Sequence, residues 1–408
     1  MLPKGWAWCR LGDIGIINPK NNLNDELEVS FIPMALISEG FSNAYTYEVK
    51  KWKNIKKGYT HFCNEDIGIA KITPCFENRK SVIFNNLKNG VGAGTTELYI
   101  LRNNKTISFN KYLFWVVKTQ EFINKGIESF TGAVGQQRVS KDFIENTLIP
   151  LPPLAEQHRI VQKIEQLFAL VDIIEVNKKA LEKLIEQAKS QVLSDAVAGK
   201  LTHQDPNDEP AEELLKRIGK TTAPDTPYEK MLPKGWAWCR LGDIGIINPK
   251  NNLNDELEVS FIPMALISEG FSNAYTYEVK KWKNIKKGYT HFCNEDIGIA
   301  KITPCFENRK SVIFNNLKNG VGAGTTELYI LRSNKTLSFN KYIFYFVKTQ
   351  EFINNGIKGF TGAVGQQRIS RYFIENTLIP LPPLAEQHRI VKKIETYFSF
   401  FDTIESNL

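Results

Sequence analysis

The sequence predicts an α+β protein with two globular mixed α/β domains, each followed by a long helix, and with the two helices paired as an antiparallel coiled coil about a pseudo-twofold axis. Residues 1–178 return as residues 231–408 at a constant offset of 230, with no difference over the first 102 positions and about 20 over the remaining 76. Each copy opens with short apolar segments broken by turn residues and then changes to a heptad pattern. Solenoid units run to roughly 20–50 residues, so this longer period indicates a whole domain and its helix written twice.

The first part of each copy predicts a compact domain with a mostly β core. Short β-branched and apolar segments predict strands at 67–73, 82–84 and 98–101, and turn formers such as Asn89-Gly90 separate them. The run 110–124 predicts a helix. Ser140 then predicts the N-cap of a further short helix.

After residue 150 the sequence predicts one long helix. Pro153 suits a first helical turn, and Glu156 suits the positive end of the helix dipole. Apolar residues then recur in steps of four and three, interrupted only at Lys178, which is the pattern of a coiled coil. We expect a helix over 154–198, roughly 65 Å long at about 1.5 Å per residue. The seam residues are Ile160, Ile164, Leu167, Val171, Ile174, Leu181, Ile185, Ala188 and Val192, and in the second copy Ile390, Ile394, Tyr397, Phe401, Ile404 and Leu408.

A single apolar stripe needs a partner, and the stripe of the other copy is the nearest candidate. Copies related by a twofold axis perpendicular to the helices pair antiparallel, and larger residues in the second copy then pack against smaller ones in the first. The alternative is a helix that lies on its own domain. The substituted pairs are Leu167 and Tyr397, Leu170 and Phe400, and Val171 and Phe401.

These patterns divide the chain into five parts. Residues 201–230 are rich in Pro, Asp, Thr and Lys, which predicts a linker with one short helix at 211–218. The expected parts are a first domain at 1–150, a long helix at 151–200, the linker at 201–230, a second domain at 231–380 and a second long helix at 381–408.

Positive charge is concentrated in the two domains. Residues 1–150 hold 19 Lys and Arg against 14 Asp and Glu, and residues 231–380 hold 19 against 12, within a net charge of +8 for the chain. A basic domain surface favours phosphate backbones, so we expect a nucleic-acid partner. The alternative is a solvated basic face without a partner. No run approaches the roughly 18 apolar residues of a membrane span.

No residue set predicts catalysis or a resident metal. There is no Walker loop and no dinucleotide-binding glycine motif. The spacing of His61, Cys63 and Cys75 does not fit a zinc finger. Without an export signal, the six cysteines are interpreted as reduced, buried, small apolar residues.

Three segments of each copy carry residues suited to DNA, with a solvated loop or turn as the alternative for each. A basic loop holds five lysines around one tryptophan, which suits phosphates. A strand then runs into a turn with Asn, Arg and Lys, the side chains that read adenine and guanine, while the neighbouring Glu77 either accepts from cytosine or neutralises the cluster. A glycine loop ends in Gln-Gln-Arg. The candidates are Lys50, Lys51, Lys53, Lys56 and Lys57; Lys71, Thr73, Asn78, Arg79 and Lys80; Gln136, Gln137 and Arg138; and, in the second copy, Lys280, Lys281, Lys283, Lys286, Lys287, Lys301, Thr303, Asn308, Arg309, Lys310, Gln366, Gln367 and Arg368.

Four stretches make the chain resemble the specificity subunit of type I restriction–modification enzymes. They are Leu-Pro-Lys-Gly-Trp-Ala-Trp-Cys-Arg-Leu-Gly-Asp at 2–13, Ile-Thr-Pro-Cys at 72–75, Gly-Gln-Gln-Arg at 135–138, and Pro-Leu-Pro-Pro-Leu-Ala-Glu-Gln-His-Arg-Ile-Val at 150–161. The last leads into the long helix and occurs twice, so the resemblance covers the whole chain.

The resemblance implies a function. In that family two target recognition domains each read one half of a bipartite DNA site in the major groove, and the paired helices set the spacer. It implies a non-catalytic cytoplasmic subunit without a cofactor of its own. Two modification subunits that use S-adenosylmethionine dock on it, and restriction subunits join them, so that S-adenosylmethionine, ATP and Mg²⁺ belong to the partner subunits.

The near-identity of the two copies departs from the family, whose members normally carry two different recognition domains. We therefore expect an interrupted palindrome as the target, with Trp115 against Tyr345 and Glu128 against Lys358 as the substitutions most able to break the symmetry. A DNA-modifying enzyme and a protein–protein adaptor are the alternatives. Cleavage or methyl transfer by the chain alone would indicate the enzyme, and lack of DNA affinity at low salt would indicate the adaptor.

Overall fold

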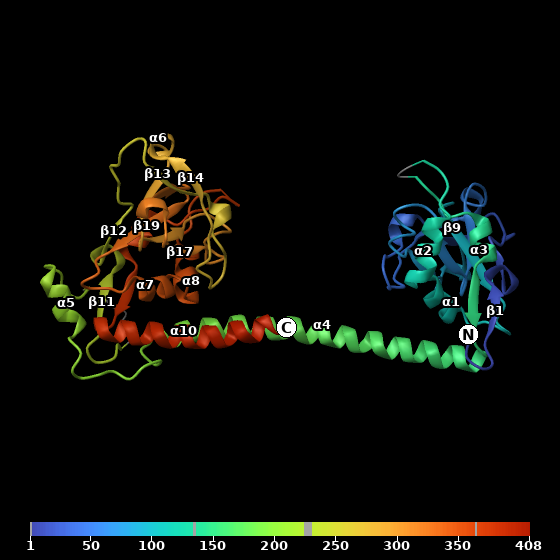
Figure 1. Ribbon diagram of the computed structural model, residues 1–408, viewed down its shortest axis with the longest axis horizontal. Coiled ribbons are helices and arrows are strands. Elements are labelled where there is room, and N and C mark those ends of the chain that lie inside the picture. Colours follow the sequence, from blue (N-terminus) through green and yellow to red (C-terminus); the bar gives the residue numbers. More distant parts are fainter. Residues whose placement is uncertain (1, 134–135, 224–230, 364) are drawn as a thin grey trace. The chain divides into compact units, whose positions relative to one another are not determined.

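The structure is a computed structural model that describes residues 2–133, 136–223, 231–363 and 365–408. The chain divides into two compact units, Met1–Glu175 and Val176–Leu408. Each unit contains one copy of the repeated domain (Figure 1). Within the described residues, no helix combines the length and the apolar character needed to cross a membrane.

The first domain folds around two four-stranded sheets. The sheet with the order β2-β9-β6-β7 is antiparallel, whereas in the order β4-β3-β8-β5 the strands β3 and β8 run parallel. β1 and β10 form a separate antiparallel pair, which joins the start of the domain to its end. The strands are β1 Ala7–Arg10, β2 Gly15–Ile17, β3 Glu28–Ile32, β4 Glu48–Lys51, β5 Thr60–Cys63, β6 Ile67–Ala70, β7 Ser81–Ile83, β8 Val91–Gly94, β9 Leu98–Asn103 and β10 Leu148–Leu151.

The core of this domain follows from its apolar strands and from two close contacts. All four residues of β6 are buried, as expected for a strand between two neighbours. The rings of Phe62 and Phe84 stack with their centroids 3.9 Å apart between the two sheets. At Gly126 in α2, a Cβ atom would lie 2.2 Å from the ring of Phe76, so only glycine lets the helix approach this closely.

The helix expected over 110–124 is wrong in one respect, because two helices occupy this stretch. α1 (Asn110–Val117) ends before Lys118, and α2 (Gln120–Glu128) begins after Thr119, whose hydroxyl accepts a hydrogen bond from Phe122 N. A capping threonine and an inward-pointing lysine therefore interrupt the apolar pattern. The expected cap at Ser140 is confirmed, since its side chain accepts from Phe143 N at the start of α3 (Lys141–Asn146).

The second unit repeats this domain with the same strand orders and registers. Below, the residue 230 positions later in the sequence is called the twin of a first-copy residue. The elements are β11 Ala237–Arg240, β12 Gly245–Ile247, β13 Glu258–Ile262, β14 Glu278–Lys281, α6 Trp282–Ile285, β15 Thr290–Cys293, β16 Ile297–Ala300, β17 Ser311–Ile313, β18 Val321–Gly324, β19 Leu328–Ser333, α7 Asn340–Val347, α8 Gln350–Lys358, α9 Arg371–Asn376 and β20 Leu378–Leu381.

The two long helices are α4 (Leu154–Val197) and α10 (Leu384–Ser406), and a short α5 (Ala211–Arg217) lies in the stretch expected to be a linker. Inside the second unit, α10 runs antiparallel to the second half of α4, as Figure 1 shows. Lys189 Nζ contacts Asp402 at 2.7 Å and Glu405 at 2.9 Å, and Lys178 Nζ donates to the carbonyl of Leu408 at 2.9 Å. The expected antiparallel pairing is confirmed here. However, α10 packs against the second half of α4, whereas Leu167, Leu170 and Val171 lie in the first half. Size complementarity between these residues and their larger counterparts in α10 therefore does not hold this helix pair together.

A buried glutamine fastens each domain to its long helix. Gln157 is fully buried near the start of α4; its Oε1 accepts from Phe109 N at 2.8 Å, and its Nε2 donates to the carbonyls of Ile107 and Pro152 at 3.0 and 2.9 Å. Gln387 repeats the arrangement in the second unit. Because every polar atom of the amide is used, the helix start has one fixed orientation on its domain.

Replacing Gln157 with leucine tests this clamp. Gln157→Leu keeps the shape but leaves one backbone N–H and two carbonyls without their partner, and a buried unpaired group costs roughly 1–3 kcal/mol. We expect the free energy of unfolding of the first unit to fall by about 2–4 kcal/mol in urea titrations. Gln162→Leu, at an exposed position of the same helix, is the control. An equal free energy of unfolding for the two variants would contradict the stabilising role of the Gln157 hydrogen bonds.

Candidate nucleic-acid interface

Two of the predicted DNA-binding segments lie side by side. Thr73 N donates to the carbonyl of Gln137 at 3.0 Å, and Val139 N donates to the carbonyl of Lys71 at 2.8 Å. An isolated β-bridge joins Ile72 to Arg138. Residues 71–80 and 131–138, called the paired loops below, therefore form one surface. Val134 and Gly135 of the predicted glycine loop lie outside the described residues.

Arg138 holds the paired loops in place. Its Nε and Nη2 donate to the two carboxylate oxygens of Glu97, each at 2.9 Å, and its Nη1 donates to the carbonyl of Gln136 at 3.1 Å. Hydrogen bonds from Arg138 are the largest cause that lowers the pKa of Glu97. A planar bidentate pair fixes orientation well. We therefore interpret Arg138 as a residue that positions Gln136, and contact between Arg138 and DNA stays a prediction.

Arg79 is also turned into the protein. It has a positive φ of 55°, and its Nε donates to the carbonyl of Lys118 at 3.0 Å while Nη2 donates to Gln120. Its guanidinium lies over the ring of Phe41, 5.2 Å from the centroid. Arg79 thus shapes the loop that presents the exposed Asn78.

Lys118, which sequence reasoning missed, anchors this loop from below. Its side chain is buried, and its Nζ donates to the carbonyls of Gly40, Ser42 and Arg79 at 2.6, 3.1 and 2.9 Å. Burial lowers the pKa of Lys118 to about 8. The only sequence signal was a charged residue at the end of an apolar helical run.

The remaining residues of the paired loops divide into anchored and exposed groups. Lys80 Nζ is largely buried and reaches the carbonyl of Met34 at 3.4 Å and Glu39 at 3.6 Å. Lys71 Nζ lies 5.2 Å from the ring centroid of Tyr99. The Thr73 hydroxyl is buried and has no hydrogen-bond partner among the described residues. Asn78, Gln136 and the neighbouring Glu77 are exposed. Two amide side chains and one carboxylate are therefore the most exposed of these groups.

The predicted basic loop carries its own neutralising acids. Glu26 contacts both Lys51 and Lys53, at 2.8 and 2.7 Å, and Lys56 contacts Asp25 at 2.7 Å. The hydrogen bonds from the two lysines lower the pKa of Glu26 to about 2. Lys50 contacts Glu48 at 3.0 Å and lies over the Phe31 ring, so Lys57 is the one lysine of this cluster with no ion pair among the described residues. Phosphate binding by this loop stays a prediction, and Lys57 is the lysine that can bind a phosphate without breaking an ion pair seen among the described residues.

The second unit presents the same surface. Arg368 contacts Glu327 with two distances of 2.9 Å, Thr303 N donates to the carbonyl of Gln367 at 3.0 Å, and Arg309 Nε donates to the carbonyl of Lys348 at 3.1 Å. Arg309 additionally lies 3.5 Å from Glu186 of α4. The twins Lys280, Lys281, Lys283, Lys286 and Lys287, Lys301, Asn308 and Lys310, and Gln366 repeat the exposure pattern of their first-copy counterparts.

None of the substitutions expected to break the symmetry falls within the paired loops themselves. Trp115 stacks on Phe168 of α4 with centroids 4.9 Å apart, and Tyr345 meets Phe398 of α10 edge-on at 5.7 Å. Glu128 and Lys358 end α2 and α8. The paired loops that carry the exposed amides are alike in sequence and in local geometry in the two copies.

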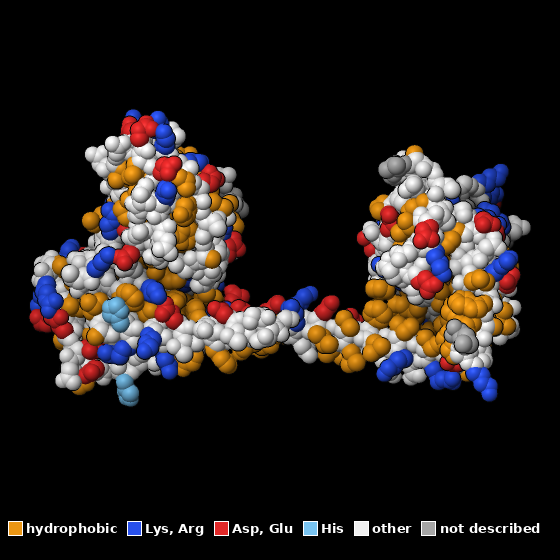
Figure 2. Space-filling view, in the orientation of Figure 1, with side chains coloured by type: hydrophobic (Ala, Val, Ile, Leu, Met, Phe, Trp, Pro, Cys, Tyr) orange, Lys and Arg blue, Asp and Glu red, His pale blue; other side chains and the backbone are white. Residues whose placement is uncertain are grey.

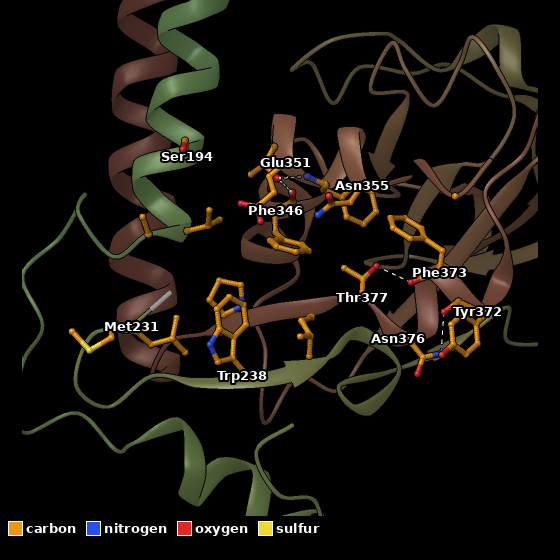
Figure 3. Close-up of a pocket in the computed structure, with 18 of the residues that line it drawn as sticks. Ser194, Met231, Trp238, Phe346, Glu351, Asn355, Tyr372, Phe373, Asn376 and Thr377 are labelled. Atoms are coloured by element: carbon orange, nitrogen blue, oxygen red, sulfur yellow. Dashed lines mark hydrogen bonds between the residues drawn. The ribbon is translucent and has the colours of Figure 1, made fainter. Parts of the chain in front are cut away.

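Two further features of the described residues, possible metal ligands and the cavities, lie outside the paired loops. The described residues contain no group of three or more His, Cys, Asp or Glu side chains placed to hold a metal ion. A cavity of about 880 Å³ in the second unit (Figure 3) is lined by Trp238, Phe346 and Phe352, among others, and none of the predicted DNA-binding side chains lines it. The cysteines are free; Cys239 is buried and the other five are half-buried, less buried than expected.

Comparison with known proteins gives a consistent set of relatives. Residues 3–183 and 233–408 both match the family described as the type I restriction modification DNA specificity domain. The chain is 35% identical to the type I restriction enzyme EcoAI specificity subunit of Escherichia coli, over 97% of this chain and 77% of that protein. It is 33% identical to the EcoEI specificity subunit of Escherichia coli, over 100% and 80%. The fold is similar to the crystal structure of the HsdS subunit from Thermoanaerobacter tengcongensis, with a TM-score of 0.65 and 19% identity over 100% of this chain and 92% of that one.

The buried lysines predict a pH dependence of stability. Burial lowers the pKa of Lys348 to about 7, against an ordinary value of 10.5. At a pH between these two pKa values, Lys348 is protonated in the unfolded chain and neutral in the folded chain. The free energy of unfolding of the second unit should therefore rise as the pH rises through this range. Urea titrations at pH 6.5 and pH 9 should show a smaller rise in Lys348→Met than in the native chain and in the exposed control Lys358→Met. A rise of the same size in all three proteins would refute the assignment.

Proposed function

Because this chain belongs to the family of type I restriction–modification DNA specificity domains over both of its copies, we propose that it is the DNA-recognition subunit of a type I restriction–modification complex. Each domain reads one half of a bipartite site through the exposed tips of its paired loops. The long helices set the number of base pairs between the half-sites and dock the modification subunits.

The chemistry of the paired loops supports this function. Asn and Gln side chains pair bidentately with adenine in the major groove, and the exposed Asn78 and Gln136 stand on a framework fixed by Arg138 and Lys118. Base readout needs such fixed donors and acceptors, because a mobile side chain pays for its ordering on each encounter. The positive charge of both domains supports attraction to phosphates.

The partners and cofactors of the proposed complex follow from the same assignment. The chain itself has no catalytic role and binds no cofactor. Two modification subunits supply the S-adenosylmethionine-dependent methyl transfer, and restriction subunits supply the steps that use ATP and Mg²⁺. The complex acts on DNA in the cytoplasm.

The target of this chain is an interrupted palindrome. Residues 71–80 and 301–310 are identical, as are 131–138 and 361–368, and the bidentate Arg–Glu pair beneath them has the same distances in both copies. Two domains with identical paired loops, one on each DNA strand, select the same short half-site on each strand. The proposal of a symmetric target rests on this repeat of loop sequence and Arg–Glu distances.

Sequencing of methylated bases in cells that express the chain with its modification subunits tests the proposal. We expect one methylated motif that consists of a short half-site, a spacer of fixed length and the inverted half-site. An asymmetric bipartite motif would refute the symmetric reading. Methylation independent of this chain would refute the recognition function itself.

Substitution of one copy at a time tests the paired loops. Asn78→Ala removes one amide from the paired loops of the first domain only. A good bidentate contact favours the correct base pair over a wrong one by about 1–3 kcal/mol. We expect one half of the methylated motif to become degenerate while the other stays intact, with Asn308→Ala giving the mirror image. Lys125→Ala, at an exposed position of α2 outside residues 71–80 and 131–138, is the control and should leave the motif unchanged. An intact motif in both single variants would exclude Asn78 and Asn308 from base reading.

A further inference from the structure

Lys118 is a buried lysine whose ammonium group is held by backbone carbonyls. Many Lys and Arg side chains on the surface of the two domains stand beside Asp and Glu side chains, as Figure 2 shows for one face. Lys118, in contrast, is 1% exposed and has no ion pair among the described residues. Its Nζ donates to the carbonyls of Gly40, Ser42 and Arg79 at 2.6, 3.1 and 2.9 Å, and it lies 4.7 Å from the ring centroid of Phe114.

The three carbonyls join two chain segments beside Asn78. Gly40 and Ser42 lie in the connection that precedes β4, and Gly40 N donates to the carbonyl of Asn78 at 2.8 Å. Arg79 is the residue after Asn78, and its Nε donates back to the carbonyl of Lys118 at 3.0 Å. The ammonium group of Lys118 thus closes a ring of contacts around the residue that presents an exposed amide.

The number of carbonyls decides which protonation state of Lys118 fits. An ammonium group has three N–H donors, one for each carbonyl. A neutral amine has two, so one of the three carbonyls loses its partner. Burial, and after it the guanidinium of Arg79, lowers the pKa of Lys118 to about 8. The same two segments also carry Glu39 and Lys80, which contact each other at 3.6 Å.

Lys348, the twin of Lys118, has fewer carbonyls to satisfy. It is fully buried, and among the described residues its Nζ donates to two carbonyls, those of Gly270 and Arg309, at 2.6 and 2.9 Å. The Arg309 guanidinium faces it and is approached at 3.5 Å by Glu186 of α4. Two N–H groups suffice for two carbonyls, so the ammonium and the neutral amine both fit. In agreement with this, burial lowers the pKa of Lys348 further, to about 7.

We propose that Lys118 is a positioning residue for base reading whose ammonium form the first domain requires, whereas Lys348 positions the loop of the second domain in either protonation state. The inference rests on the proposed function, because it takes the paired loops as the base-reading surface. When one carbonyl loses its partner, the connection that holds Asn78 loosens, and the exposed amide loses its fixed direction. Base reading by hydrogen bonds depends on this direction, whereas attraction to phosphates does not. The two half-sites therefore respond differently to pH, although identical loops read them.

Competition between DNA duplexes tests the proposal on the complex of the chain with its modification subunits. The discrimination ratio is the Kd of a duplex with one substituted half-site divided by the Kd of a duplex with the intact methylated motif. A duplex with one substituted half-site can bind in either orientation, so this ratio reports the more tolerant domain. We expect the ratio to fall about three- to tenfold between pH 6.5 and pH 9.5, the usual effect of one lost hydrogen bond, because Lys118 loses its proton.

Lys118→Met is the decisive variant. Its discrimination ratio at pH 6.5 should already equal that of the native chain at pH 9.5, and it should not change with pH. The slope of log Kd against log salt concentration should equal the native slope, because a buried ammonium group contacts no phosphate. Lys125→Met, at an exposed position of α2, is the control and should keep the native ratio and its fall with pH. If Lys118→Met does not fold, the pH profile of the native chain still decides.

A duplex with both half-sites substituted tests the second domain. In Lys118→Met the first domain no longer responds to pH, so any remaining change in the ratio for this duplex comes from the second domain. We expect the same ratio at pH 6.5 and pH 9.5, because Lys348 keeps both of its carbonyls as a neutral amine. A fall of the ratio with pH would contradict the role given to Lys348.

Three results would overturn the role given to Lys118. One is a native discrimination ratio that does not change between pH 6.5 and pH 9.5. Another is a native ratio in Lys118→Met. The third is a salt slope that Lys118→Met reduces by about one, which would make Lys118 a phosphate contact. Lack of any discrimination by the native complex at pH 6.5 would instead contradict the recognition function itself, so the two failures are distinguishable.

Discussion

A long helix with one apolar stripe gains most of its stability where that stripe is covered, and this constraint organises the second unit. In the second unit the stripe of α10 is covered by the second half of α4, and Lys189 between Asp402 and Glu405 sets the register of the pair. The buried amides of Gln157 and Gln387 then fasten each domain to the start of its helix. Because the repeat supplies the same stripe twice, the first unit retains a surface with the same requirement.

The recognition surface depends on groups that do not themselves face the ligand. Arg138 donates hydrogen bonds to Glu97, and Arg79 donates to the carbonyl of Lys118. Lys118 in turn donates to three backbone carbonyls beneath the loop. These interactions hold the exposed amides in a defined geometry, which is the condition for reading bases by hydrogen bonds. Arg79, Arg138 and Lys118 thus hold the backbone of the paired loops by hydrogen bonds within the domain.

The sequence predicted what depends on periodicity and local chemistry. The repeat, the strands near 67–70, 81–83 and 98–103, the cap at Ser140 and the helix from Leu154 follow from patterns that a single sequence displays. The break between α1 and α2 was not predicted, because the contacts of Lys118 Nζ with the carbonyls of Gly40, Ser42 and Arg79 are tertiary and leave no signal in the run 110–124. The meeting of residues 71–80 with 131–138 was not predicted, since a β-bridge between loops leaves no periodic signal. The difference between the exposed Trp8 and the half-buried Trp238 lies beyond any pattern, because the two residues have the same neighbours in sequence and different ones in space.

Hydroxyl-radical footprinting of the chain and its modification subunits on a duplex that carries the methylated motif tests the central claim most directly. If two identical readers engage equivalent half-sites, the protected backbone positions on one strand should match those on the other after rotation about the centre of the motif. Protection of one half-site alone, or two patterns that no twofold rotation relates, would contradict the account.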